Sequence, residues 1–185
     1  IDKRGSLRET FSKKIFKQNR FIFEYCTISK INSLRGFHFQ YKFSQAKYVN
    51  VLQGKILDCV VDLRKKSKTF GKVFKIILSD KNCLSLYIPE GFAHAYYSFE
   101  KKNIIYYKLT NYYKPKYEDG VNVMDKHFKI KWPSKKVLLS PKDNTRGLIS
   151  SKLASFEQKA VYKPFKNGVA CFAAAPVKPN AFITL

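Results

Sequence analysis

Residues 46–63 read AKYVNVLQGKILDCVVDL and contain two β-rich runs, 46–52 and 55–63. Gln53-Gly54 separates the runs, and glycine supplies the positive φ that a tight turn requires. Valine, isoleucine and tyrosine favour the pleated backbone of a strand. The stretch therefore predicts two strands joined by a hairpin turn.

The same pattern extends outward in both directions, from Arg20 to Thr110, with further turn signals at 79–82 and 89–91. Short strands without intervening helices predict an all-β sandwich or barrel, because βαβ units need a helix between neighbouring strands. The expected strands are 20–29, 33–40, 46–52, 55–63, 72–78, 83–88, 92–99 and 103–110.

Four polar side chains fall on the mostly apolar faces of these strands: His38, Lys47, His94 and Tyr107. Side chains alternate between the two sides of a strand, so each of the four shares its side with the residues two positions away. A few polar heads on an apolar face are typical of a barrel interior with a ligand cavity.

The chain has 185 residues, enough for one domain with its own core. A hydrophobic fraction of 45% and an aromatic fraction of 16% exclude a disordered chain, which lacks the apolar surface needed to offset ordering entropy. We expect residues 1–153 to form the β-domain and residues 154–185 to form a tail of unclear structure. Short helices are expected toward the C-terminus, near 125–128 and 150–158.

The charge is strongly positive, because 36 Lys and Arg residues against 13 Asp and Glu residues give +23. Such a balance favours a polyanionic partner, such as nucleic acid, a membrane surface or a phosphorylated ligand. The lysines stand as scattered pairs rather than as one basic block, which weakens the nucleic-acid interpretation. A general enrichment in lysine explains the charge equally well.

Four cysteines, Cys26, Cys59, Cys83 and Cys171, have no CxxC spacing. This favours free thiols and a reduced, cytoplasmic setting. No signal peptide opens the sequence, and its longest apolar runs fall far short of the roughly 18 residues of a membrane helix. We expect a cytoplasmic protein that contacts neither membrane nor nucleic acid.

A series of short motifs runs in order from Asp2 to about Lys152. They are DKRG at 2–5, LRGFHFQ at 34–40, QAK at 45–47, VLQG at 51–54, VVDLR at 60–64, IPEGFAH at 88–94, YK at 107–108, EDG at 118–120, IKWP at 130–133 and LSPKD at 139–143. Each motif alone is weak, but so many in register are a specific signal. In this order they resemble the dTDP-4-dehydrorhamnose 3,5-epimerase family, the cupin-fold nucleotide-sugar epimerases.

The resemblance implies a cupin-type jelly roll that acts as a homodimer on a nucleotide-diphosphate sugar. It implies inversion of C3 and C5 beside the C4 ketone of a 4-keto-6-deoxy sugar, with no cofactor and no metal. The chemistry is consistent with that, because a positioned base removes a proton α to a carbonyl when the enolate is stabilised electrostatically.

The resemblance also assigns roles. His38 is the general base, and an imidazole with an ordinary pKa of about 6.5 suits that task. Asp143 orients His38, Lys47 stabilises the enolate at O4, and Tyr107 donates a proton from the opposite face. The residues implied to bind the sugar and the diphosphate are Arg4, Glu9, Arg35, Gln40, His94, Tyr113 and Glu118.

The sequence departs from the family pattern in the strand before the LRGFHFQ motif. Family members usually carry glutamine and asparagine there, and this chain has Phe23 and Tyr25. The departure bears on which nucleotide or sugar is bound.

Other functions remain open beside this one. A single-centre epimerase on a GDP- or CDP-linked ketosugar uses the same base and ketone, and a sugar-binding cupin without catalysis needs only the pocket. A metal-dependent cupin is disfavoured, because the three histidines include no HxH pair and metal sites need several converging ligands. A nucleic-acid binder rests on charge alone.

Overall fold

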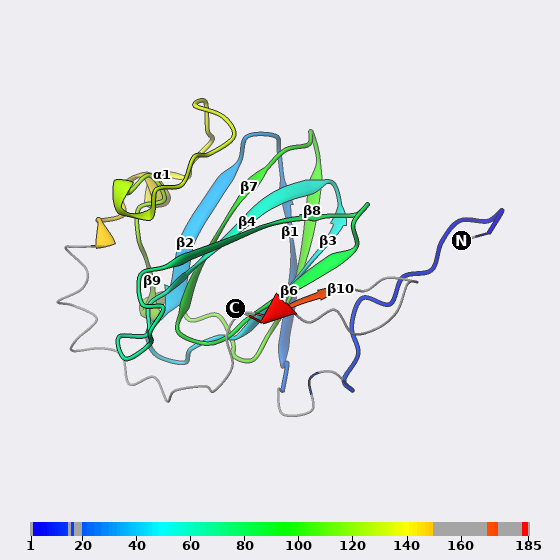
Figure 1. The fold of residues 1–185 in the computed structure, drawn as a ribbon, viewed down its shortest axis with the longest axis horizontal. Coiled ribbons are helices and arrows are strands. Elements are labelled where there is room, and N and C mark those ends of the chain that lie inside the picture. The colour runs from blue at the N-terminus through cyan, green and yellow to red at the C-terminus, as the bar shows by residue number, and fades with distance from the viewer. Residues whose placement is uncertain (1, 15, 17–19, 150–169, 174–182, 185) are drawn as a thin grey trace.

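The computed structural model describes residues 2–14, 16, 20–149, 170–173 and 183–184. Two antiparallel β-sheets pack against each other in a sandwich (Figure 1). One sheet has the strand order β1 (Phe23–Ser29), β8 (Asn103–Leu109), β3 (Lys47–Gln53), β6 (Leu84–Ile88), β10 (Ala170–Ala173) and β11 (Ile183–Thr184). The other has the order β5 (Val73–Ser79), β4 (Lys55–Asp62), β7 (Phe92–Ser98), β2 (Leu34–Gln40) and β9 (Glu118–Gly120).

All eight strands expected from the sequence are present, and the all-β prediction is confirmed. The largest boundary error is at β1, which begins at Phe23 rather than at residue 20. The predicted turn joins β3 to β4, where Gly54 has a φ of +89°. An added Cβ at Gly54 would stand 2.6 Å from Oδ1 of Asn103, so both the conformation and the space require glycine.

Between β8 and residue 148, the described chain forms three short helices: η1 (Pro115–Tyr117), η2 (Lys126–Phe128) and α1 (Pro141–Asn144). The helix expected near 125–128 is η2, and the one expected at 150–158 lies outside the described residues. Helix α1 was not predicted as a helix. Ser140 begins it, because the Ser140 hydroxyl accepts a hydrogen bond from the Asp143 amide and Pro141 fits the first helical turn.

The interior between the sheets is an apolar cluster to which both sheets contribute. Its buried members are Val49, Val51, Ile56, Val60, Leu78, Leu86, Ile88, Phe92, Tyr96, Ile105, Tyr107 and Leu109. The period of two predicted this face, and burying each large side chain contributes about 1.5–3 kcal/mol. Lys47, His94 and Tyr107 therefore lie among interior side chains, as expected.

A second core covers the opposite face of the five-stranded sheet. Phe37 and Phe39 of β2 pack there with Val121, Val123 and Phe128 from the segment after β9. This packing folds the segment after β9 back over β2 and brings α1 beside that strand.

The expected tail contributes two short strands to the six-stranded sheet. β10 pairs antiparallel with β6, and β11 pairs with β10. These strands cover the β6 edge, which would otherwise expose unpaired backbone groups. The predicted domain boundary at residue 153 lies outside the described residues.

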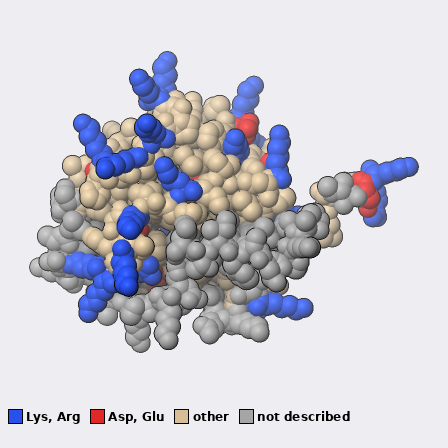
Figure 2. Space-filling view, in the orientation of Figure 1, with Lys and Arg blue, Asp and Glu red and all other residues tan. Residues whose placement is uncertain are grey.

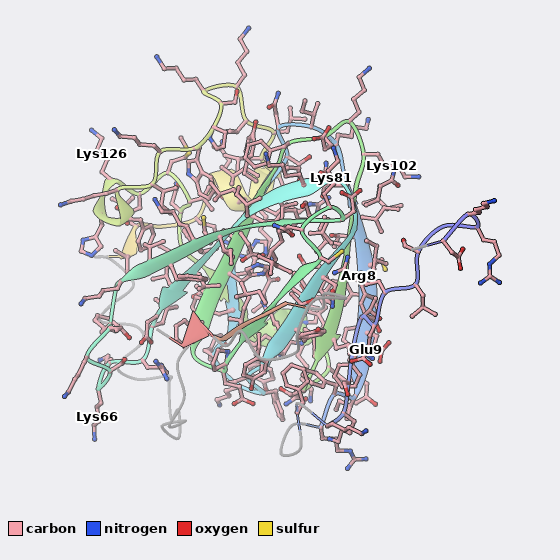
Figure 3. All side chains as sticks on the ribbon, turned by 45° about the vertical axis from the view of Figure 1, so that its right-hand side comes forward. Arg8, Glu9, Lys66, Lys81, Lys102 and Lys126 are labelled. Atoms are coloured by element: carbon pink, nitrogen blue, oxygen red, sulfur yellow. The ribbon has the colours of Figure 1, made fainter. Side chains whose placement is uncertain are left out.

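Positive charge is spread over the surface. Figure 2 shows Lys and Arg side chains projecting singly from the visible face, with neutral surface between them. In Figure 3, Lys66 and Lys126 lie far apart on the left of the view, whereas Lys81 and Lys102 lie near each other toward its right. No helix in the described part of the chain is long and apolar enough to cross a membrane.

Candidate active site

A cleft of about 520 Å³ opens beside β2, the start of β9 and α1. It is lined by Ser33, Leu34, Arg35, His38, Tyr113, Glu118, Leu138, Leu139, Ser140, Lys142 and Asp143. Five of the residues predicted for the site from distant parts of the sequence meet here: Arg35, His38, Tyr113, Glu118 and Asp143.

His38 and Asp143 form a close pair although 105 positions separate them. Nε2 of His38 is 2.5 Å from Oδ1 of Asp143, and the histidine side chain is one-third exposed while the aspartate is buried. Burial acts to raise the pKa of Asp143, but hydrogen bonds from His38 and Ser140 outweigh it and hold the pKa below its ordinary value. Asp143 is therefore an ionised partner that orients the imidazole.

Lys47 brings a buried ammonium group beside this pair. Its Nζ lies 3.5 Å from the carbonyl oxygen of His38. Burial lowers the pKa of Lys47 to about 8, and the charges of Glu118 and Asp58 act in the opposite direction. The ammonium is thus charged at neutral pH, and no carboxylate among the described residues forms an ion pair with it, which suits it to stabilise a developing negative charge.

Tyr107 stands on β8 and is almost fully buried. Its ring packs edge-on against His94 at 6.1 Å and stacks on Tyr25 of β1 at 4.8 Å. Burial, followed by the neighbouring Tyr96, Tyr25 and Asp58, raises the pKa of Tyr107 well above its usual range. The phenol therefore stays protonated and is available as a proton donor.

His94 has a carboxylate partner that the sequence analysis missed. Its Nε2 is 2.8 Å from Oδ2 of Asp58, and both side chains are buried. The other oxygen, Oδ1, has no hydrogen-bond partner among the described residues. The sequence does contain a feature that indicates this partner. Asp58 is an acidic residue in the apolar run of β4, on the inward side that it shares with Ile56 and Val60.

The rim of the cleft is held by Glu118. Its carboxylate accepts hydrogen bonds from Tyr113 at 2.7 Å and from Arg146 at 3.0 Å, and it also pairs with Lys142. Burial acts to raise the pKa of Glu118, but Lys142, Tyr113 and the charge of His38 lower it below its ordinary value. Lys142 and Arg146 were not predicted for the site.

Arg35 connects the cleft to the opposite sheet. Its Nε donates to the Ser29 hydroxyl at 3.1 Å, and that hydroxyl also lies 2.9 Å from the Tyr96 hydroxyl. Tyr96 makes a second contact with Thr27 at 3.0 Å. These bonds join edge strand β1 to β2 and β7 across the sandwich.

The structure places three predicted substrate-binding residues, Gln40, Arg4 and Glu9, elsewhere than in the cleft. Gln40 is buried, and its amide bonds to backbone groups of Phe43, Tyr112 and Lys114, so it fixes the loop that carries Tyr113. Arg4 is exposed and pairs with Asp2, and Glu9 is also exposed. The N-terminal segment projects from the side of the molecule opposite α1 (Figure 1), so Arg4 stands outside its own chain's cleft.

The histidine–carboxylate pair lines the cleft, whereas the Lys47 ammonium and the Tyr107 phenol are buried in the interior and are not part of its lining. These groups fit proton transfer at carbon beside a carbonyl. Among the described residues, no group of three or more His, Cys, Asp or Glu side chains is arranged to hold a metal ion. Fold and site together define a jelly-roll enzyme of the acid/base type.

Comparisons with known proteins assign the family. The model of the family described as dTDP-4-dehydrorhamnose 3,5-epimerase matches residues 1–151. The dTDP-4-dehydrorhamnose 3,5-epimerase of Methanothermobacter thermautotrophicus is 40% identical over 149 residues, which cover 77% of this chain and 80% of the relative.

Solved structures of similar proteins support the same family assignment. The dTDP-6-deoxy-D-glucose-3,5-epimerase of Legionella pneumophila, in complex with dTDP-4-keto-L-rhamnose, matches with a TM-score of 0.83 at 35% identity and covers 89% of each chain. A 3'-monoepimerase from Streptomyces bikiniensis, in complex with dTDP-quinovose, matches with a TM-score of 0.78 at 26% identity over 87% of this chain and 91% of the other.

The chain belongs to the dTDP-4-dehydrorhamnose 3,5-epimerase family. This membership confirms the resemblance drawn from the motifs, the jelly-roll fold and the isomerase class.

Proposed function

We propose that this chain inverts C3 and C5 of a dTDP-linked 4-keto-6-deoxy sugar, with His38 as the base. The contact between His38 and Asp143 in the cleft carries the proposal. With Nε2–H donated to Asp143, Nδ1 is unprotonated and is the atom that accepts the proton from carbon. Removal of that proton gives an enolate with its charge on O4.

Lys47 stabilises this enolate. Its ammonium is buried, and a charge interaction is worth far more in a site that excludes water than in solution. The Tyr107 phenol then donates its proton to the same carbon from the opposite face. Return of a proton from solvent to Tyr107, and loss of one from His38, resets both groups.

We further propose that substrate binding involves the rim and a second copy of the chain. Arg35, Tyr113 and Glu118 line the cleft and are placed to hold the sugar and the diphosphate. Arg4 is exposed on a segment that projects from its own domain, so a homodimer in which this segment reaches the partner's cleft gives Arg4 a role. Glu9 is exposed but stands between Arg8 and Thr10, which both bond to Asn50 of β3 in the same chain. A cytoplasmic setting is supported by Cys26, Cys59 and Cys83, which are free thiols.

A single-centre epimerase is the second candidate, and the likeness to the Streptomyces bikiniensis 3'-monoepimerase favours it. The same base and enolate serve one centre or two, so placement of the sugar decides between them.

Solvent deuterium incorporation tests both candidates. The protein is incubated without added metal in D₂O with dTDP-4-keto-6-deoxyglucose, and NMR reports label at C3 and C5. Double inversion predicts label at both carbons, whereas the second candidate predicts label at one. GDP- and CDP-linked ketosugars are run in parallel.

His38→Ala is the matched variant and His127→Ala is its control, because His127 is exposed and packs against Phe128 away from the cleft. We expect His38→Ala to lose incorporation by roughly 10²–10⁴-fold or more. Turnover by His38→Ala equal to that of wild type would rule out His38 as the base. Absence of label with every ketosugar would leave a sugar-binding protein.

A further inference from the structure

Tyr25 lies directly against the proposed proton donor. Strand β1 is an edge strand that pairs with β8, and Tyr25 stands opposite Tyr107 in that register. The two ring centroids are 4.8 Å apart, with an angle of 24° between the planes, so the rings are stacked. One face of the Tyr107 ring is thus in contact with the Tyr25 ring.

The surroundings of Tyr25 differ from those of a core residue. Its side chain is 36% exposed and does not belong to the buried cluster between the sheets. Its ring also packs against Phe23 at 5.7 Å. Burial of the hydroxyl, together with the charges of Tyr96, Glu118 and Tyr113, raises the pKa of Tyr25. Tyr25 therefore lies between the buried Tyr107 ring and solvent.

A phenol that protonates carbon has to hold its hydroxyl in one direction, because misplacement by about 1 Å costs on the order of 10²-fold in rate. The Tyr107 ring is contacted edge-on by His94 and face-on by Tyr25. Without the Tyr25 ring, the face toward the open edge of the sheet is uncovered and other ring orientations become accessible.

We infer that Tyr25 is a positioning residue whose stacked ring holds Tyr107 in line for protonation. The inference rests on the proposed function, because it assumes that Tyr107 donates the second proton. It concerns the ring of Tyr25 rather than its hydroxyl, since the stacking contact is what restrains Tyr107.

The test separates proton removal from inversion. Two rates are measured for each variant, deuterium incorporation and net inversion, and their ratio gives the fraction of enolate protonated on the opposite face. Tyr25→Leu removes the stacked ring, Tyr25→Thr removes it with a residue that favours strands, and Tyr25→Phe keeps the ring. Tyr106→Leu is the control, because Tyr106 neighbours Tyr107 on β8 but points to the outer face with Glu24.

Tyr25→Leu and Tyr25→Thr are expected to lower net inversion by about 10- to 100-fold while incorporation falls less than about 3-fold. Tyr25→Phe and Tyr106→Leu are expected to stay within about 3-fold of wild type for both rates. In a Tyr107→Phe background, Tyr25→Leu should change neither rate further, because two residues that act through one group are not additive.

Equal losses of incorporation and inversion, or a Tyr25→Phe variant as impaired as Tyr25→Leu, would overturn the inference. A further loss on top of Tyr107→Phe would do so as well. A wild-type protein without any incorporation would instead refute the proposed function, so the two failures are distinguishable.

Discussion

The short contact between Asp143 and His38 leads to a prediction about a single substitution. Asp143→Asn keeps the side chain's shape but removes the charge that stabilises a protonated imidazole. We expect kcat to fall by about 10²–10⁴-fold with little change in KM, because a general base contributes about that much. Steady-state kinetics check this. Asp80→Asn, on the turn between β5 and β6, is the control and should retain activity.

The same variant reports on stability. The pKa of Asp143 is lower in the folded protein than in the unfolded chain, so its ionised form stabilises the fold above the unfolded pKa of about 3.9. That stabilisation is lost as the pH falls through the folded pKa. Thermal unfolding midpoints should therefore fall less steeply with acid in Asp143→Asn than in wild type. Parallel curves would contradict the assignment.

The pKa of Lys47 leads to a second prediction about a single residue. Its pKa of about 8 means that the ammonium is charged below pH 8 and neutral above it. We expect kcat to decline above pH 8 as the enolate loses its stabilising charge. Lys47→Arg, which stays protonated at every relevant pH, should move this decline to higher pH in a kcat profile. Lys47→Met should lose about 10²–10³-fold at all pH values. An alkaline decline unchanged in Lys47→Arg would assign it to another group.

Strand β2 carries Arg35 and His38, and its contact with β7 depends on Gly36. Gly36 has a φ of +117°, and an added Cβ would stand 2.4 Å from the carbonyl oxygen of His94 and 2.6 Å from Cα of Ala95. The backbones of β2 and β7 could not approach so closely with any other residue. The element that presents the base is therefore fixed by a contact without side chains.

Gly36→Ala should lower the free energy of unfolding by about 3 kcal/mol or more and reduce activity, since β2 must move away from β7. Gly71→Ala is the matched control. Gly71 also has a positive φ, +74°, but its Cβ would meet only the His127 ring at 3.7 Å. It should cost about 1–2 kcal/mol and leave kcat unchanged. Equal costs in urea unfolding would show that the close approach has no effect.

The whole molecule presents an apolar outer face on the six-stranded sheet. Ile28 is 65% exposed and Leu52 is 43% exposed, and Cys26 is exposed on the same side of β1 as Ile28. Exposed apolar patches of this kind mark association surfaces. They agree with the proposed homodimer, which gives Arg4 access to a partner's cleft.

Sedimentation velocity tests that assembly. We expect a dimer for wild type, and we expect Ile28→Lys to shift the population toward monomer, because a buried unpaired ammonium is costly. Lys102→Glu, which changes a charge on an exposed turn, should leave the dimer intact. If Ile28→Lys keeps the wild-type sedimentation coefficient, the dimer uses another surface or does not form.

The net charge is a further property of the whole molecule. The chain carries +23, and on the face shown in Figure 2 the Lys and Arg side chains of the described residues stand at several separate places. Dispersed positive charge attracts a diphosphate to the molecule. From the composition alone, the kind of polyanionic partner was undetermined.

The strands, their turns and the inward faces could be predicted from the sequence, because alternation and turn chemistry are local properties of the chain. The motifs also selected His38, Lys47, Tyr107 and Asp143, whose assigned roles stay predictions. The folded structure was needed to show which side chains touch. It paired His94 with Asp58, gave the Gln40 amide to backbone groups and set Tyr25 against Tyr107. Such contacts depend on the register of paired strands and on how the two sheets pack. A sequence pattern specifies neither of these.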